Sequence, residues 1–203
     1  MSDSKAATDQ RTELIRAASQ LLNEFGFRRP TLGDVAKVAQ VSLGEVYHHF
    51  DTKEALAEAV IAVQEAALRE RFASWVAVHQ DPRARLHCLV RAPLDAKDTV
   101  IQFGCPHNSL YQELAKLGPG SPLSRAAAEL LAIYLEWTEK QICALGYPRP
   151  EAALLATDLV IALQGTLLMA RTLQSDELLV EQLVRVERWI DETILEQRSQ
   201  RQS

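Results

Sequence analysis

The chain has 203 residues, of which 47% are hydrophobic and 24% charged, a balance typical of soluble globular domains. Its formal net charge of -5 argues against nonspecific binding to polyanions, so any contact with nucleic acid would depend on a specific motif. No apolar run approaches the roughly 20 residues of a membrane span, and the polar first residues contain no signal-peptide core, so we expect a cytoplasmic protein without a membrane partner.

Residues typical of helix starts and helix ends occur along the whole chain. Polar residues or prolines mark starts, glycines mark ends, and no alternating β-branched run appears. We therefore predict an all-α fold of about nine helices. The expected helices span residues 9–25, 32–39 and 43–49 and begin near residues 53, 82, 107, 122, 150 and 176.

The two short helices at 32–39 and 43–49 form the most informative part of the pattern. Helices of about two turns are not stable alone, so these two must pack on neighbours. Thr31 with Asp34, and Ser42 with Glu45, match the capping box, in which a hydroxyl and a carboxylate satisfy free backbone N–H groups. Small apolar residues flank the turn between them. The sequence therefore predicts a helix-turn-helix whose second helix projects outward.

This region resembles the DNA-binding domain of the TetR family. The resemblance is carried by Tyr-x-x-Phe-x-x-Lys-x-x-Leu at residues 47–56, directly after Val-Ser-x-Gly at 41–44. It implies a three-helix DNA-binding domain at 1–52 and a larger helical ligand-binding and dimerisation domain at 53–203. It further implies a homodimeric transcriptional repressor, released from a palindromic double-stranded DNA operator by an unidentified small molecule, with no enzymatic activity, cofactor or metal.

The resemblance also implies which residues contact DNA. Those candidates cap the two helices, face the major groove or contact phosphates, and they are Arg28, Thr31, Ser42, Leu43, Gly44, Glu45, Tyr47, His48 and Lys53. Gln40 stands where the family usually has glycine, which predicts a left-handed backbone at a non-glycine residue. Glu45 replaces a small residue, and its carboxylate either accepts from a cytosine amino group or stays in the capping box. We favour the capping box.

The segments 150–173 and 176–198 are placed where the family forms its dimer. Small residues in the first and an apolar seam in the second suit close helix packing. We expect about half of the apolar positions at the interface, because the rest must face their own subunit. The interface candidates are Ala152, Ala156, Leu159, Leu183, Val186, Trp189 and Ile190.

A second group of residues combines aromatic bodies with polar tips, as a small-molecule pocket does. Ordinary core packing is the alternative, because aromatic residues at helical spacing usually pack against one another. The ligand-binding candidates are Phe72, Trp75, His79, Phe103, Cys105, His107, Tyr111, Tyr134 and Trp137.

Cys105 lies in the segment Gly-Cys-Pro-His-Asn-Ser-Leu at 104–110, which is similar to an element of part of the TetR family. A thiol at a helix N-terminus has a lowered pKa, and His107 can assist, which suggests a redox or electrophile sensor. A buried small hydrophobic residue is the alternative. Cys88 and Cys143 show no paired spacing, so all three cysteines are expected to be free thiols.

Two other classes of function remain open. A thiol hydrolase would use Cys105 with a histidine and a carboxylate, although no spacing supports it. A helical interaction module would keep the helix-turn-helix shape without binding DNA, and Glu45 together with the acidic balance keeps that alternative open.

Overall fold

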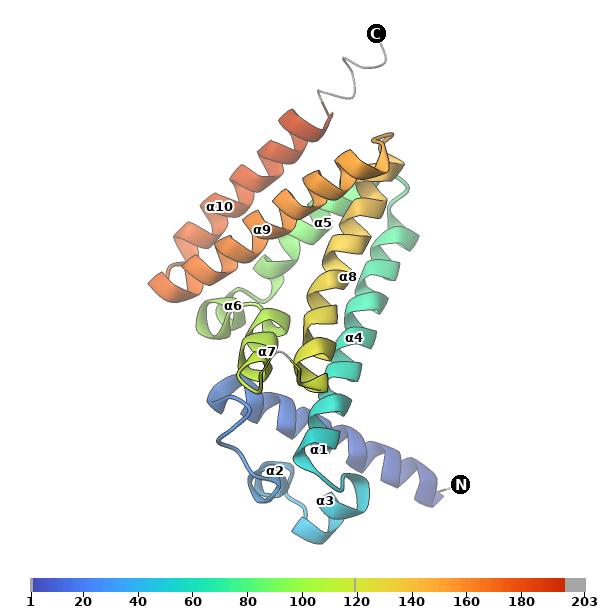
Figure 1. The fold of residues 1–203 in the computed structure, drawn as a ribbon, viewed down its shortest axis with the longest axis vertical. Helices are drawn as coiled ribbons and strands as arrows, with labels where there is room; N and C mark the ends of the chain where they lie inside the picture. Colours follow the sequence, from blue (N-terminus) through green and yellow to red (C-terminus); the bar gives the residue numbers. More distant parts are fainter. Residues whose placement is uncertain (1, 119, 196–203) are drawn as a thin grey trace. The chain divides into compact units, whose positions relative to one another are not determined.

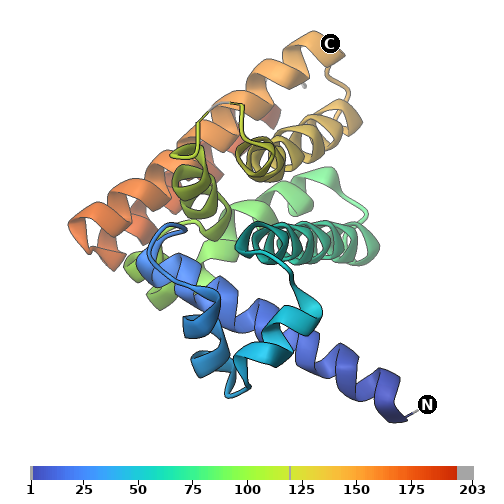
Figure 2. The ribbon, with the colours of Figure 1, turned by 60° about the horizontal axis from the view of Figure 1, so that its bottom comes forward.

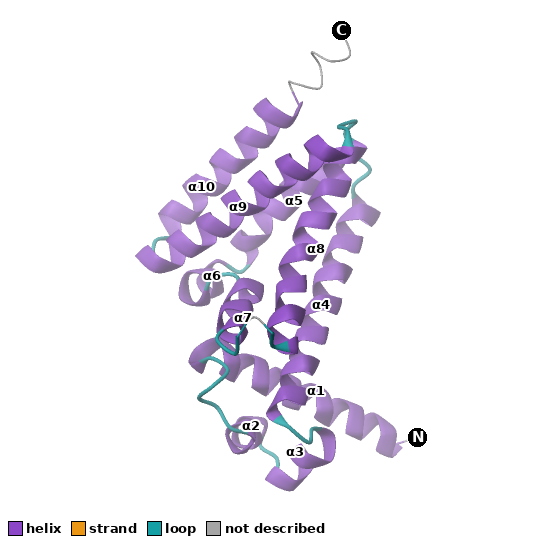
Figure 3. Cartoon of the chain, in the orientation of Figure 1, coloured by secondary structure: helices purple, strands orange, loops and turns teal. Residues whose placement is uncertain are grey.

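The computed structural model describes residues 2–118 and 120–195, and every regular element within them is helical (Figure 3). This confirms the predicted all-α fold. Figure 1 labels the elements in chain order, which are α1 (Ser2–Phe25), α2 (Leu32–Ala39), α3 (Leu43–His49), α4 (Lys53–Val78), α5 (Pro82–Asp95), α6 (Lys97–Phe103), α7 (Pro106–Ala115), α8 (Pro122–Ala144), α9 (Arg149–Leu173), α10 (Asp176–Trp189) and the π-helical segment η1 (Ile190–Leu195).

The helix that the sequence pattern missed is α6. It is separated from α5 by Ala96 alone, whose backbone is neither helical nor extended (φ -123°, ψ 33°). Neither glycine nor proline marks this break, and α6 begins without a side-chain cap. Pro93 lies inside α5, where a helix break would be expected, yet the helix continues to Asp95.

The chain divides into two compact units, Met1–Ala67 with Ser109–Leu130 and Leu68–Asn108 with Leu131–Ser203. The division passes through α4, α7 and α8, each of which contributes residues to both units. A functional boundary after residue 52 therefore stays a prediction. The two units are described separately.

In the first unit, α2 contacts both α1 and α3 (Figure 2). Val35 and Ala36 of α2 and Val46 of α3 are buried together with the apolar face of α1, which includes Leu14. Burial of these side chains stabilises helices that are too short to persist alone. The predicted helix-turn-helix is present.

In the second unit, α9 contacts α10 and α6, and α10 also contacts α5. Ionic contacts add to the apolar packing between α5 and the end of the chain. His87 Nε2 lies 2.9 Å from Asp191 Oδ1, and its Nδ1 lies 3.3 Å from Glu187 Oε1. Arg83 also pairs with Asp191 at 3.0 Å, and Arg91 pairs with Glu187. These contacts hold α10 and η1 against α5.

Among the described helices, α9 is long and apolar enough to cross a membrane by length and composition, although the sequence pattern had suggested no such segment. About two fifths of its most apolar window, 39%, is buried in the chain. A single helix of this kind is weak evidence for a membrane span, because the core helix of a soluble protein has the same composition. The exposed part of α9 is nevertheless unusually apolar.

Gln40 has the left-handed backbone that the sequence predicted (φ 57°, ψ 39°), where the N–H of Val41 donates to the carbonyl of Ala36 at 3.0 Å. A side chain costs energy in this conformation, so Gln40→Gly should raise the free energy of unfolding by about 0.5–1 kcal/mol. Glu58→Gly, at an exposed right-handed position in α4, should lower it by about 1 kcal/mol. Urea unfolding measures the unfolding free energy of both variants. A Gln40→Gly variant less stable than wild type would contradict backbone strain at Gln40.

Candidate functional site

One face of α3 is open to solvent. Leu43, Gly44, Tyr47 and His48 are exposed, and their spacing places them on one side of the helix. Two of them are large side chains that remain accessible, with Leu43 45% and Tyr47 51% exposed. The opposite side carries Val46, which is fully buried. The helix therefore presents a mixed apolar and polar surface to solvent, while Val46 packs its opposite side against the core of the first unit.

The capping box at the start of α3 is complete. The Glu45 carboxylate accepts from the Ser42 N–H at 2.7 Å, and Ser42 Oγ accepts from the Glu45 N–H at 3.2 Å. The hydrogen bond from the Ser42 backbone is the main cause that lowers the pKa of Glu45. This confirms the favoured capping role for Glu45, whose carboxylate is occupied within the chain. Thr31 forms the corresponding box with Asp34 at the start of α2.

Gln10, which the sequence reasoning missed, connects α1 to α3. Its amide Nε2 donates to Glu45 Oε1 at 2.9 Å, and its Oε1 lies 3.1 Å from His49 Nε2. The Gln10 side chain thus bonds to α3 at two points, the carboxylate of Glu45 and the ring nitrogen of His49. Only the folding of α1 across α3 brings these residues together.

The cationic side chains of Arg28 and Lys53 form hydrogen bonds within the first unit. Arg28 Nη2 donates to the carbonyl of Lys116 at 2.8 Å. Lys53 Nζ donates to the carbonyl of Arg28 at 3.2 Å and lies 4.6 Å above the Phe27 ring. Burial lowers the pKa of Lys53. Both residues had been predicted to reach DNA phosphates, but in this structure they join the turn after α1 to α4 and to the end of α7.

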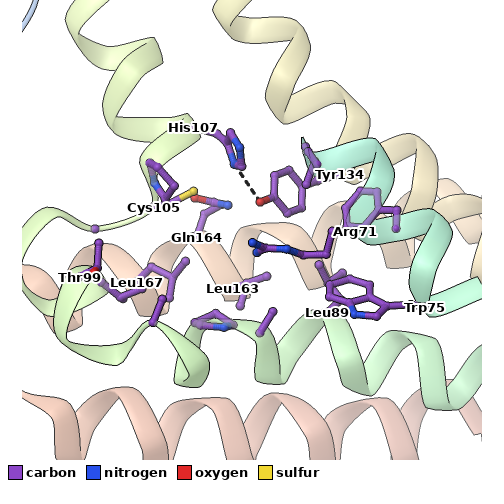
Figure 4. Close-up of a pocket in the computed structure, with 18 residues that line it drawn as sticks. Arg71, Trp75, Leu89, Thr99, Cys105, His107, Tyr134, Leu163, Gln164 and Leu167 are labelled. Carbon is purple, nitrogen blue, oxygen red and sulfur yellow. Dashed lines mark hydrogen bonds between the residues drawn. The ribbon is translucent and has the colours of Figure 1, made fainter. Parts of the chain in front are cut away.

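A cavity of about 160 Å³ lies within the second unit, and Figure 4 shows the side chains around it. Residues from α4, α5, α6, α8 and α9 line it, together with the start of α7. Five of the nine predicted ligand-binding residues are among them, namely Phe72, Trp75, Cys105, His107 and Tyr134.

The other four predicted residues do not line this cavity. Trp137 stacks on Phe72 with ring centroids 4.4 Å apart, so it supports the cavity wall from outside. His79 lines a separate surface recess at the start of α5. Phe103 ends α6 without reaching the cavity, and Tyr111 belongs to the first unit.

His107 and Tyr134 form a polar pair in the cavity wall. His107 Nδ1 lies 3.0 Å from the Tyr134 hydroxyl. Burial, helped by the nearby charge of Arg71, lowers the pKa of His107 to about 4. Burial also raises the pKa of Tyr134. Both groups are therefore uncharged at neutral pH.

Cys105 does not have the lowered pKa that its position at a helix start had suggested. The side chain is 6% exposed, and burial raises the pKa of its thiol more than the Asn108 N–H, the Gln164 side chain and the His107 N–H together lower it. His107 pairs with Tyr134 rather than activating the thiol. All three cysteines are free, as predicted, and the described residues contain no cluster of side chains suited to a metal ion.

Arg71 is the polar side chain of the cavity that the sequence reasoning missed, and Gln164 is a second polar side chain in the wall. Figure 4 shows the Arg71 guanidinium extending into the cavity toward Gln164. Both polar atoms of the Gln164 amide are buried without a hydrogen-bond partner. The spacing of Leu68, Arg71, Phe72 and Trp75 follows one helix face, so Arg71 could have been found from the predicted positions of its neighbours.

The predicted dimer residues lie mostly inside the chain. Trp189 is half-buried, and the other six are buried within a single copy, so they are unavailable to a partner. Those six are Ala152, Ala156, Leu159, Leu183, Val186 and Ile190. Helical periodicity identified an apolar face correctly but could not tell which of two apolar faces meets the core of the same chain.

The lowered pKa of buried His107 predicts how the stability of the protein depends on pH. The unfolded chain takes up a proton near pH 6.5, whereas folded His107 does so only near 4, so stability should fall as pH falls through this window. This group should cost up to about 3 kcal/mol of unfolding free energy by its lower end. His107→Gln should lack that slope and His79→Gln, outside the cavity, should retain it. Denaturant unfolding across the window measures this, and parallel curves for wild type and His107→Gln would refute it.

Comparison with known proteins identifies the N-terminal region. A family model described as "Bacterial regulatory proteins, tetR family" matches residues 14–60. The HTH-type transcriptional repressor KstR2 of Rhodococcus jostii is 34% identical over 96 residues, which cover 47% of each chain. The HTH-type transcriptional regulator BetI of Burkholderia ambifaria is 37% identical over 90 residues, covering 42% of this chain and 45% of BetI. The chain thus spans about half the length of these curated relatives.

Solved structures extend the likeness in fold over most of the chain. A TetR transcriptional regulator from Legionella pneumophila superposes with a TM-score of 0.73 at 16% identity, covering 87% of this chain and 94% of its own. The reduced form of Escherichia coli NemR gives 0.73 at 23% identity, covering 88% and 96%. Residues 14–60 thus match the tetR family of bacterial regulatory proteins in sequence, and the chain shares its fold with solved regulators of that family.

Proposed function

We propose that the protein is a cytoplasmic transcriptional repressor that binds a palindromic DNA operator as a homodimer and is released by a small molecule. The observation that carries this proposal is the exposed face of α3. A helix whose outer side is free and whose inner side is anchored can enter a major groove. The KstR2 match, named a repressor, supports the choice of repression over activation.

The residues of the exposed face have different roles in the proposed complex. Leu43 offers an apolar contact to a thymine methyl, and Gly44 allows the backbone to approach the base edges. An added Cβ at Gly44 would meet only Ser42 Oγ, at 3.8 Å, so the free protein does not itself require glycine there. Tyr47 and His48 donate hydrogen bonds to phosphates.

Selection from a random pool of double-stranded DNA tests the proposal. A homodimer should enrich a palindrome with half-sites about one helical turn apart. The enriched sequence would establish DNA binding, symmetry and spacing together. Failure to enrich any sequence would refute the proposal and favour a helical module that does not bind DNA.

Tyr47→Phe isolates the phosphate contact. Loss of one hydrogen bond should weaken binding about 3- to 10-fold, to a similar degree for every sequence. Leu43→Ser should instead change the preferred base at one position. Tyr111→Phe, which removes a hydroxyl away from α3, serves as the matched control. Fluorescence anisotropy with the selected operator and scrambled DNA measures all three, and unchanged affinity for Tyr47→Phe would remove the tyrosine from the contact surface.

The outer face of α9 supports a dimer interface. Leu154, Ile161 and Leu168 are 69%, 63% and 46% exposed, and they recur every seven residues. Gly165 lies on the same exposed stripe with no atom within 4 Å of an added Cβ, which leaves room for close helix approach. Val180 of α10 adds further exposed apolar surface. This face replaces the buried residues first predicted for the interface.

A charge on this face should separate the dimer. Ile161→Glu places two carboxylates in a symmetric interface and should weaken association roughly 100-fold or more. Val78→Glu, at a side chain 73% exposed near the end of α4, makes the same chemical change elsewhere and should leave the dimer intact. Sedimentation velocity over a concentration series distinguishes them. If Ile161→Glu remains dimeric while folded, the interface lies on another face.

Two continuous helices support communication between ligand and DNA. The α4 helix carries Phe72 and Trp75 in the cavity wall and Lys53 at its first residue. The α7 helix begins beside the cavity at Pro106 and ends just before Lys116, to whose carbonyl Arg28 donates. A ligand that favours one position of these helices would alter DNA affinity by about 5- to 150-fold, a typical coupling.

The alternatives based on Cys105 have less support. A sensor or a hydrolase needs an accessible thiolate, whereas this thiol is buried and its pKa is raised by burial. Reversible binding of a ligand in the cavity is therefore the form of regulation that we propose.

A further inference from the structure

The cavity contains one positive charge and, among its described lining residues, no aspartate or glutamate. That charge belongs to Arg71, whose guanidinium extends into the cavity (Figure 4). No hydrogen bond or ion pair joins this guanidinium to another residue that the structure describes. The other basic side chain in the wall, His107, is neutral because it is buried and lies near Arg71. The cavity thus has a positive potential with no internal counter-charge.

The Gln164 amide is a second unsatisfied group in the same cavity. Its Nε2 donor and its Oε1 acceptor are both buried without a hydrogen bond of good geometry, and the Cys105 thiol, whose pKa the amide helps to lower, lies beside them as a weak partner. Buried polar atoms of native proteins are almost always paired, so an unpaired amide in a cavity wall indicates a missing partner. A ligand that accepts from Nε2 would provide it.

The remaining wall limits the size and polarity of that ligand. Phe72, Trp75, Leu163 and Leu167 give the cavity a largely apolar lining. Its volume of about 160 Å³ is close to that of a protein cavity which holds benzene, roughly 150 Å³. The ligand therefore has an apolar part of about one ring, or a short alkyl chain.

We infer that the effector is a small organic carboxylate, in which one carboxylate binds Arg71 and Gln164 and a single ring or short chain fills the apolar part of the cavity. This inference rests on the proposed function, in which the cavity is the effector site. A carboxylate matches the guanidinium because two parallel N–H groups can donate to its two oxygens. The nearby amide donor completes the coordination of the anion.

A cationic ligand is the main competitor, because aromatic walls also bind quaternary ammonium groups. Phe72, Trp75 and Tyr134 provide such aromatic surfaces. However, an unpaired guanidinium in the same cavity repels a cation, and no described carboxylate of the lining offsets this repulsion. The charge distribution therefore favours the anion.

Isothermal titration of the full chain with matched probes tests the ligand class. Benzoate and hexanoate are the carboxylates, benzamide and hexanamide are their neutral counterparts, and phenyltrimethylammonium is the cation. At neutral pH at least one carboxylate should bind 10- to 100-fold more tightly than its amide, as expected for a charge-assisted bidentate contact.

Variants identify the residues that produce this preference. Arg71→Gln should abolish the advantage of the carboxylate over the amide, and Arg71→Lys should retain part of it because a point charge cannot bind bidentately. Gln164→Leu should weaken the carboxylate without removing the preference. Arg69→Gln makes the same charge change on the same helix outside the cavity and should preserve wild-type selectivity. Circular dichroism verifies that each variant is folded.

Several results would overturn the inference. They are equal binding of amide and carboxylate, tighter binding of the ammonium, absence of binding by both carboxylates, or unchanged selectivity in folded Arg71→Gln. Because titration requires no DNA, its result is independent of the operator selection. A palindrome without carboxylate binding would refute the ligand class alone, whereas carboxylate binding without any enriched DNA would refute the proposed regulator and leave the ligand class standing.

Discussion

Burial of Val46 and Phe50 is the interaction on which the exposed face of α3 depends. The α3 helix has seven residues, too few to be stable by its own hydrogen bonds. Val46 in α3 and Phe50, which caps its end, are 0% and 4% exposed, and this packing determines which side of α3 faces outward. The capping box and the Gln10 contact then fix the beginning of the helix. Rotation by a third of a turn would bury Tyr47 and expose Val46.

Burial also determines the chemistry of the cavity. A thiol and an imidazole near a helix start suggest reactive groups when only the sequence is considered. In the folded chain desolvation dominates, so Cys105 stays a thiol and His107 stays uncharged at neutral pH. Arg71 contributes a guanidinium, a positively charged group with several N–H donors. The cavity is therefore suited to binding an anion rather than to nucleophilic chemistry.

The two opposite faces of α9 are both apolar, but one is buried and the other is exposed. Leu159 and Leu163 are buried and form the core of the second unit. Ile161 and Leu154 remain exposed, which is costly for a monomer in water. Both sets repeat with helical periodicity, and the helix is apolar nearly all around. The apolar composition of α9 thus combines a buried inner face with an exposed outer face, which is the face proposed for the dimer.

The sequence alone determined the features that depend on neighbours along the chain. Helix starts at Thr31 and Ser42, the left-handed Gln40 and the resemblance of residues 41–56 to the TetR family all follow from local patterns. Only the tertiary structure decided which apolar face of α9 is buried, which predicted aromatic residues share the cavity, and that Arg28 and Lys53 bond within the chain. These outcomes depend on contacts between segments far apart in sequence, and the resulting burial sets exposure and charge state.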